Sequence, residues 1–382
     1  MSTRTVEVDI LRAMALVGIC VVNVPFLAGL DAMSKPDAPI DKVATVIVEV
    51  FFQGKFFTLF SFLFGWSFFA QYTSAQRRRR PLVAKYLRRL SGLLLLGVGH
   101  VLLVFDGDIL ILYALLGSAL LLVRQWTPVR LLKLAAGLTL MSLFSLAILG
   151  IALSELPMEY SASSGYSGSF SDAVHQRFID WPYAFTVVAL FNGPSAMAAF
   201  CTGLAAAKTG FFEPEATSYA AIRSRLPLLL VMGLLLNTAY MCSVQNIISG
   251  EVSGLLAFSA LALGAPCLSI VYLVVIVELV RSGRLGERTA AAGRLSLTAY
   301  LAQGVIAGLI FNGYGLGLYR EAGMAMCVVI ALGIVVLVHI AAILWLSVCR
   351  QGPMEYILRK MTHGVVPITA SSDKVKNRRY ER

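Results

Sequence analysis

The chain has 382 residues, of which 58% are hydrophobic and only 14% are charged. Soluble proteins carry roughly 25% charged residues, so this composition excludes a soluble globular protein and predicts a polytopic integral membrane protein. The formal net charge of +11 does not indicate nucleic-acid binding. The excess basic residues lie in short loops between hydrophobic segments, where they act as an orientation signal.

Hydrophobic segments long enough to cross a bilayer follow one another along the whole chain. Because each crossing needs about 20 apolar residues, we expect an all-α bundle of about ten transmembrane helices. These helices lie near residues 10–30, 55–73, 87–105, 109–124, 131–153, 184–207, 226–245, 253–280, 295–313 and 322–349, within one transmembrane domain over residues 1–362. The amphipathic stretch 40–53 is expected to lie on the membrane surface.

The loops alternate in charge along the predicted bundle. Arginines crowd every second loop, for example Arg77 and Arg78 before the third span and Arg281 after the eighth. By the positive-inside rule these loops and both termini are cytoplasmic. The long polar segment 154–183 is then an external loop, either a lid or a mobile connection, and the basic tail 363–382 is expected to be disordered and cytoplasmic.

A tight helical hairpin is predicted over residues 97–117, where two apolar runs meet at Asp106-Gly107-Asp108. His100 lies about one and a half turns before this acidic corner. Ionisable groups at such a depth usually face a cavity or a partner and mark a site, so His100, Asp108 and Asp106 are candidate catalytic residues. The alternative is that His100 makes an ordinary interhelical hydrogen bond and that the aspartates only cap the turn.

Further polar residues are predicted near the outer face of the membrane. They are candidates for substrate binding: Asn23, Lys55, Tyr113, Arg177 and Gln303. Lys55 has a second interpretation, because a lysine at the start of a span can extend its ammonium group to the membrane surface.

A second polar layer is predicted near the cytoplasmic face. Its members are Asp9, Arg12, Arg294, Thr298 and Glu355. Paired carboxylates and guanidinium groups would form a structural clamp between helices. Alternatively, the arginines form a recognition site for an anionic headgroup or a nucleotide phosphate, since guanidinium binds phosphate in a bidentate manner. The spacing of histidines, cysteines and carboxylates indicates no metal site.

Five motifs, in order from residue 9 to residue 359, resemble the YeiB-like bacterial membrane proteins, a domain of unknown function. They are DILRAMALVGICVVN from Asp9, KFFTLFSFLFG from Lys55, His100 followed by GDILILY from Gly107, GRLSLTAYLAQ from Gly293, and GPME from Gly352. The chain departs from the family pattern at Ala13, where glycine is usual, and at Ala299, where asparagine is common.

The resemblance implies more than a fold. The YeiB-like family is similar, at a distance, to heparan-α-glucosaminide N-acetyltransferase and to the acyltransferase-3 membrane enzymes. This implies transfer of an acyl group from cytoplasmic acyl-CoA, as co-substrate, to a hydroxyl or amine of a small-molecule, lipid or glycan acceptor outside the bacterial inner membrane. Acyltransferase-3 proteins usually carry a histidine where this chain has Asn23. The role of His100 is therefore inferred from its own surroundings.

These observations give one preferred mechanism and two rivals. His100 would act as a general base or carry the acyl group, Asp108 or Asp106 would orient it, and Asn23, Tyr113 or Gln303 would stabilise an oxyanion. The first rival is a transporter or flippase for a small amphipathic or lipid-linked molecule. The second is a non-catalytic membrane scaffold. Membrane lipids are expected partners in each case, and the protein could form oligomers.

Overall fold

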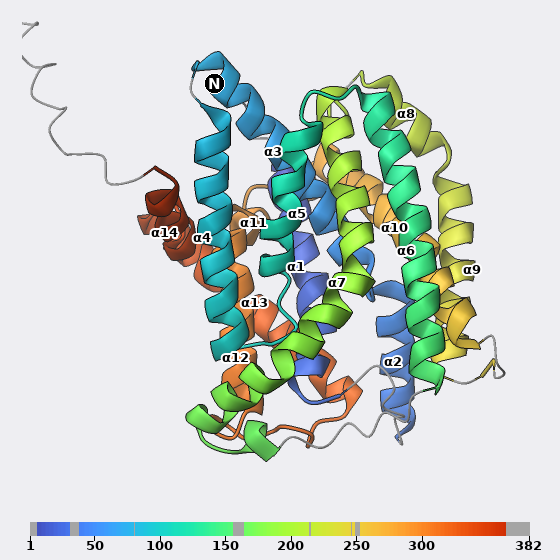
Figure 1. Cartoon of the computed structure of the whole chain (residues 1–382), viewed down its shortest axis with the longest axis vertical. Coiled ribbons are helices and arrows are strands. Elements are labelled where there is room, and N and C mark those ends of the chain that lie inside the picture. The colour runs from blue at the N-terminus through green and yellow to red at the C-terminus, as the bar shows by residue number, and fades with distance from the viewer. Residues whose placement is uncertain are drawn as a thin grey trace, which may run out of the picture.

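The computed structural model describes residues 6–30, 38–79, 81–155, 164–213, 215–245, 247–248 and 253–363. All regular secondary structure within these residues is helical (Figure 1). The helices are α1 (Val6–Leu27), α2 (Pro39–Phe51), α3 (Lys55–Arg77), α4 (Leu82–Leu103), α5 (Leu110–Val123), α6 (Pro128–Glu155), the 3-10 turn η1 (Ser164–Ser167), α7 (Phe170–Lys208), α8 (Thr217–Ser224), α9 (Leu226–Val244), α10 (Ser253–Arg281), α11 (Ala291–Arg294), α12 (Ser296–Phe311), α13 (Met324–Val348) and α14 (Pro353–His363).

The described chain is a polytopic helical membrane protein, as its composition predicts. It contains eight helical segments that are long and apolar enough to cross a bilayer, counting Pro39–Arg77 as one segment. Two further apolar helices, Leu110–Val123 and Ser296–Phe311, are shorter. At a rise of 1.5 Å per residue, α5 covers about 21 Å, which is less than a hydrocarbon core of roughly 30 Å.

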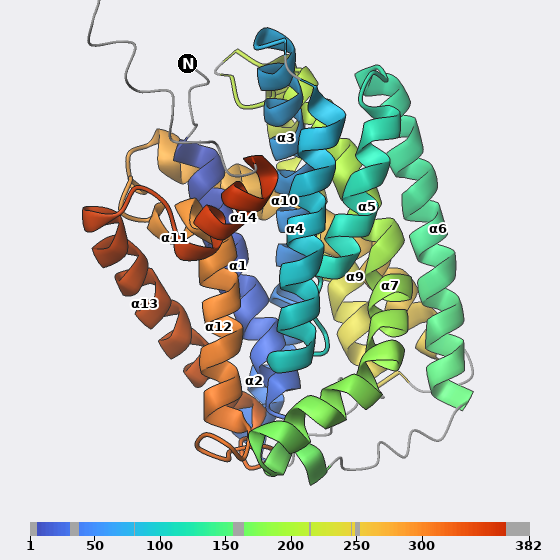
Figure 2. The ribbon, with the colours of Figure 1, turned by 60° about the vertical axis from the view of Figure 1, so that its left-hand side comes forward.

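The first helix lies at the centre of the bundle. α1 packs against α3, α10, α11, α12 and α13, while α4 with α5, α6 with α7, and α9 with α10 form neighbouring pairs (Figures 1 and 2). The start of α1 and the short amphipathic helix α14 lie at the same end of the bundle (Figure 2). α14 crosses that end and packs against α4 and α12.

The expectation that residues 40–53 lie on the membrane surface is wrong. α2 packs against α9 and α13, and it buries Val48, Glu49 and Val50. A short break separates α2 from α3, and Gly54 in this break has φ +81°. This left-handed conformation favours glycine, so the sequence interrupts one long helix at a defined position.

The expected external loop 154–183 is partly helical. α7 begins at Phe170 because Ser169 and Asp172 form a capping box. Pro182 and Pro194 lie inside α7, and proline is a common cause of helix bending. The outer part of α7 is bent and runs below the ends of α4 and α12 (Figure 2). Residues 156–163 of this loop, and the tail expected to be disordered from residue 364 onward, lie outside the described residues.

Candidate functional site

The acidic corner after α4 holds a buried histidine–aspartate pair. His100 Nδ1 lies 2.7 Å from Asp108 Oδ2, and the two residues are only 5% and 2% exposed. The other carboxylate oxygen, Oδ1, accepts a hydrogen bond of 2.6 Å from the backbone N–H of Leu110, in the first turn of α5. Asp108 therefore caps α5 and contacts the imidazole at the same time, which combines the two interpretations of the corner.

A tyrosine from a distant part of the chain completes the pair. The hydroxyl of Tyr300, on α12, donates a hydrogen bond of 2.9 Å to the same Oδ2 of Asp108. The carboxylate thus accepts contacts from α4, α5 and α12. An ionised Asp108 favours the tautomer in which His100 Nδ1 carries the proton, and this leaves the lone pair of Nε2 available as an acceptor.

His100 Nε2 faces a small pocket. This nitrogen is buried and has no hydrogen-bond partner among the described residues. The pocket is lined by Asn23 of α1, His100, and Gln303 and Gly304 of α12, together with several apolar side chains. A Cβ atom at Gly304 would stand only 2.5 Å from Nε2. The glycine therefore keeps the space in front of the imidazole free.

Asp106 does not contact this pair. Its carboxylate accepts a hydrogen bond of 3.5 Å from the hydroxyl of Tyr166, which also donates one of 3.0 Å to Asp180 of α7. Burial, and then the nearby Asp180 carboxylate, raise the pKa of Asp106. The structure thus pairs His100 with Asp108 and leaves Asp106 in an acidic contact with the outer part of α7.

Tyr113 and Lys55 lie away from the pocket lining. The hydroxyl of Tyr113 is 2.6 Å from the hydroxyl of Ser61, and its ring packs edge-on against Phe200 with centroids 5.1 Å apart. Lys55 is completely buried, and its Nζ donates a hydrogen bond of 2.8 Å to the carbonyl of Glu49. The interpretation that Lys55 extends to the membrane surface is therefore wrong, because its ammonium group is buried at the end of α2 and bonded to the backbone there.

Arg177 holds the outer part of α7 against the bundle. Its guanidinium donates hydrogen bonds of 3.2 Å to the carbonyl of Leu103, at the end of α4, and of 3.0 Å to Oδ1 of Asn312, after α12. The residue is 1% exposed. It does not line the pocket, but it connects α7 to the two helices that carry His100 and Gln303.

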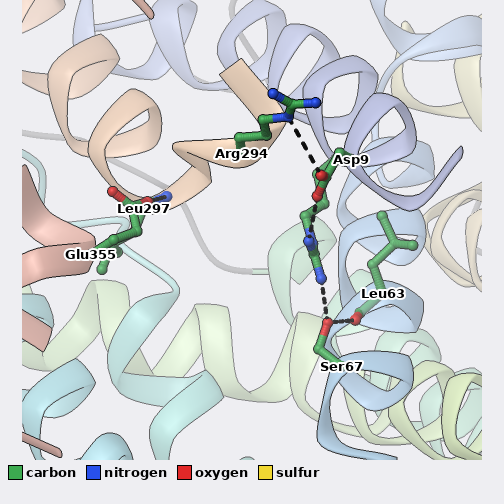
Figure 3. A network of polar contacts seen from close by, with 7 residues as sticks. Asp9, Leu63, Ser67, Arg294, Leu297 and Glu355 are labelled. Atoms are coloured by element: carbon green, nitrogen blue, oxygen red, sulfur yellow. Dashed lines mark hydrogen bonds and ion pairs between the residues drawn. The ribbon is translucent and has the colours of Figure 1, made fainter. Parts of the chain in front are cut away.

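The polar layer that the sequence predicts near the cytoplasmic face consists of two separate groups (Figure 3). In the first, Asp9 pairs with Arg12 at 2.9 Å and with Arg294 at 3.9 Å. Arg12 donates a further hydrogen bond of 2.6 Å to Ser67 of α3. The group connects α1 with α3 and with the end of α11.

The second inner group caps a helix. Glu355 of α14 accepts a hydrogen bond of 2.8 Å from the backbone N–H of Leu297 (Figure 3). It also accepts one of 3.2 Å from the backbone N–H of Thr298 and one of 2.5 Å from the Thr298 hydroxyl. These N–H groups have no partner within the first turn of a helix, so the carboxylate satisfies them. The carboxylates of both groups are occupied by protein partners, which favours the structural clamp.

Sequence reasoning gave Tyr300 no role, although it lies in one of the family-like motifs. Tyr300 and Gln303 are three residues apart and therefore share a helix face. Because Gln303 was already a candidate, its spacing from Tyr300 was the feature of the sequence that could have indicated a role for the tyrosine. Glu49 was also missed, since it lies in a stretch assigned to the membrane surface.

The bundle and the buried histidine–aspartate pair define a polytopic membrane protein with a polar site inside its helices. Residues 206–365 match the family described as "Protein of unknown function (DUF418)". The chain is 31% identical to the uncharacterized protein YxaH of Bacillus subtilis, over 93% of each chain. It is 27% identical to the uncharacterized protein YeiB of Escherichia coli, over 94% of this chain and 96% of YeiB.

The chain therefore belongs to the DUF418 family, which confirms the YeiB-like resemblance. An uncharacterized 39.9 kDa protein in the amylase 3' region of Bacillus acidopullulyticus is 26% identical over 94% of each chain. No solved structure matches the chain.

Proposed function

We propose that this protein is a membrane-embedded acyltransferase that uses acyl-CoA. The observation that carries the proposal is the orientation of His100. Its Nδ1 is held by Asp108 at 2.7 Å, and its buried Nε2 has no partner in the described chain and faces a pocket. An aligned imidazole with a free nitrogen is the arrangement required of a general base.

In the proposed reaction, His100 Nε2 removes the proton from the hydroxyl or amine of the acceptor. The acceptor atom attacks the thioester carbonyl of the acyl donor, and the bond between the carbonyl carbon and sulfur breaks. The imidazolium then returns the proton to the thiolate that leaves. Asp108 stabilises the imidazolium, and the amides of Asn23 and Gln303, which line the same pocket, are suited to donate to the oxyanion.

The donor would approach from the inner face of the membrane. His100 lies a dozen residues along α4 from Arg88, or about 18 Å at helical rise. The side chains of Arg12 and Arg294, which are 23% and 33% exposed, are candidates to contact its phosphates beside the clamp. The acceptor would reach the pocket from the outer face of the inner, cytoplasmic membrane, and both termini would be cytoplasmic.

The test uses purified full-length protein in lipid nanodiscs with acetyl-CoA, and it measures release of the free thiol. We expect His100→Ala to lower the rate about 10²- to 10⁴-fold, the usual contribution of a general base. His339→Ala is the matched control, because His339 lies on α13 outside the pocket lining. Release of thiol by His100→Ala at the wild-type rate would contradict the mechanism.

A transporter is the second candidate, and the broken helix α2–α3 favours it. Discontinuous membrane helices with buried charges are typical of transporter binding sites, and this break buries Lys55 and Glu49. An amphipathic substrate moved unchanged across proteoliposome membranes, without release of thiol from acetyl-CoA, would support transport. Thiol release without such movement would support the enzyme.

A further inference from the structure

A second group of buried polar residues lies at the break between α2 and α3. Glu49, near the end of α2, is 8% exposed, and Lys55, the first residue of α3, is fully buried. Neither residue lines the His100 pocket. Ionisable side chains inside a membrane are costly and mark functional sites by default, so this pair calls for its own explanation.

The break is supported by side chains from several helices. Lys55 Nζ donates a hydrogen bond of 2.8 Å to the carbonyl of Glu49, so its positive charge lies at the C-terminal end of α2, where the helix dipole favours it. Tyr272 donates one of 2.9 Å to the carbonyl of Phe51, and Ser269 donates one of 2.6 Å to the carbonyl of Lys55. The interruption is therefore a stable feature with satisfied carbonyl groups.

The Glu49 carboxylate is only half satisfied. Its Oε1 accepts a hydrogen bond of 2.7 Å from Gln245, at the end of α9. Its Oε2 is buried and has no hydrogen-bond partner among the described residues. Lys55 attracts the carboxylate electrostatically, but its printed hydrogen bond goes to the backbone carbonyl of Glu49 instead. A buried, ionised oxygen without a hydrogen-bond donor loses its hydration with no compensating contact, which is unfavourable. Binding of a proton to that oxygen removes the charge and with it this unfavourable desolvation.

The surroundings of Glu49 contain few other charges. Tyr240 of α9 interacts with the carboxyl group and is buried, and Tyr272 of α10 is bonded to the break. Toward α13, Asp41 accepts a hydrogen bond of 2.8 Å from the backbone of Ala325, and the thiol of Cys327 is buried close to that contact. Within the described chain, Lys55 is the charged group that acts on the Glu49 carboxyl.

We propose that Glu49 is a proton-binding site inside the membrane, separate from the His100 pocket. One proton from the aqueous phase converts its carboxylate into the neutral acid, and the charge at the break rises by one unit. Gln245, which donates to this carboxyl group, is itself only half-buried at the end of α9. Because Lys55 bonds the backbone of Glu49 itself, proton binding is coupled to the geometry of the α2–α3 break. The proposal does not depend on acyl transfer.

Infrared spectroscopy of the full chain in lipid nanodiscs tests the proposal directly. The protein is titrated with acid, and the C=O stretching absorption of neutral carboxylic acids is recorded. We expect Glu49→Gln to lose the contribution of one titrating carboxyl group. Glu278→Gln is the matched control and keeps the Glu49 contribution, because Glu278 lies elsewhere on α10 and pairs with Tyr219 and Arg223.

A second variant covers the possibility that Glu49→Gln fails to fold. Gln245→Leu removes the amide that donates to Oε1, so the Glu49 band is expected to move to higher frequency while its titration persists. Identical titrating bands in the wild type and in Glu49→Gln would overturn the proposal. If Glu49→Gln does not fold, a Gln245→Leu spectrum identical to that of the wild type would overturn it.

Discussion

Tyr300 and His100, 200 positions apart in the chain, meet at the same carboxylate oxygen. Oδ2 of Asp108 accepts the tyrosine hydroxyl at 2.9 Å and lies 2.7 Å from the imidazole nitrogen. The hydrogen bond from Tyr300 thus acts on the imidazole through the aspartate, and it ties α12 to the hairpin of α4 and α5.

The first prediction concerns this hydroxyl. Tyr300→Phe removes a hydrogen bond to a charged group, which is worth about 1.5–3 kcal/mol, and we expect thiol release from acetyl-CoA to fall by roughly tenfold or more. Tyr86→Phe is the control, since the buried Tyr86 hydroxyl has no partner among the described residues. An unchanged rate of thiol release in Tyr300→Phe would assign Tyr300 to packing alone.

The second prediction concerns the space in front of the imidazole. A Cβ at Gly304 would stand 2.5 Å from His100 Nε2, so Gly304→Ala should block the pocket and lower thiol release on the order of 100-fold, the cost typical of a displaced reacting group. Gly99→Ala, on α4 directly before His100, is the matched control, because its Cβ would meet nothing within 4 Å. Equal rates in the two variants would show that the pocket is not the reaction site.

The third prediction concerns the helix cap at the start of α12. Glu355→Ala removes the carboxylate that accepts from the backbone N–H groups of Leu297 and Thr298 and from the Thr298 hydroxyl, at the start of α12. By analogy with other N-terminal caps, the folded state should lose about 1–2 kcal/mol, measured by thermal unfolding in nanodiscs. Arg359→Ala on the same helix removes only an exposed contact to Gln351 and should change stability by less than about 0.5 kcal/mol. Equal melting temperatures for the two variants would contradict the cap.

The fourth prediction concerns pH and Asp106, which lies in the turn after α4. Its pKa is raised by burial and by Asp180, so the folded protein holds this proton more tightly than the unfolded chain does. Stability is therefore expected to fall as the pH rises from the ordinary aspartate pKa to the raised one. Asp106→Asn carries no charge, and it should melt higher than the wild type at neutral pH, with a smaller difference in acid. If Asp106→Asn raised the melting temperature by the same amount at neutral and at acid pH, the titration of Asp106 would not be the cause.

The hydrophobic pattern was sufficient to predict an all-helical membrane bundle and the hairpin that brings His100 near Asp108. Both follow from local physics, because a span must satisfy its own backbone within the bilayer and residues eight positions apart across a tight turn remain neighbours. The family-like motifs likewise depend on the sequence alone.

Only the tertiary structure decided which polar residues share a site. The packing of the first part of α7 against the bundle places Arg177 at the ends of α4 and α12. The packing of α2 against α9 places the amphipathic stretch 40–53 inside the bundle, where it precedes α3 after a short break. A period of 3.6 residues specifies which face of a helix is apolar, but it does not specify which helix meets that face. His100 contacts Asp108 because residues of α4, α5 and α12 all meet at the Asp108 carboxylate, and this meeting also brings Tyr300 to the site.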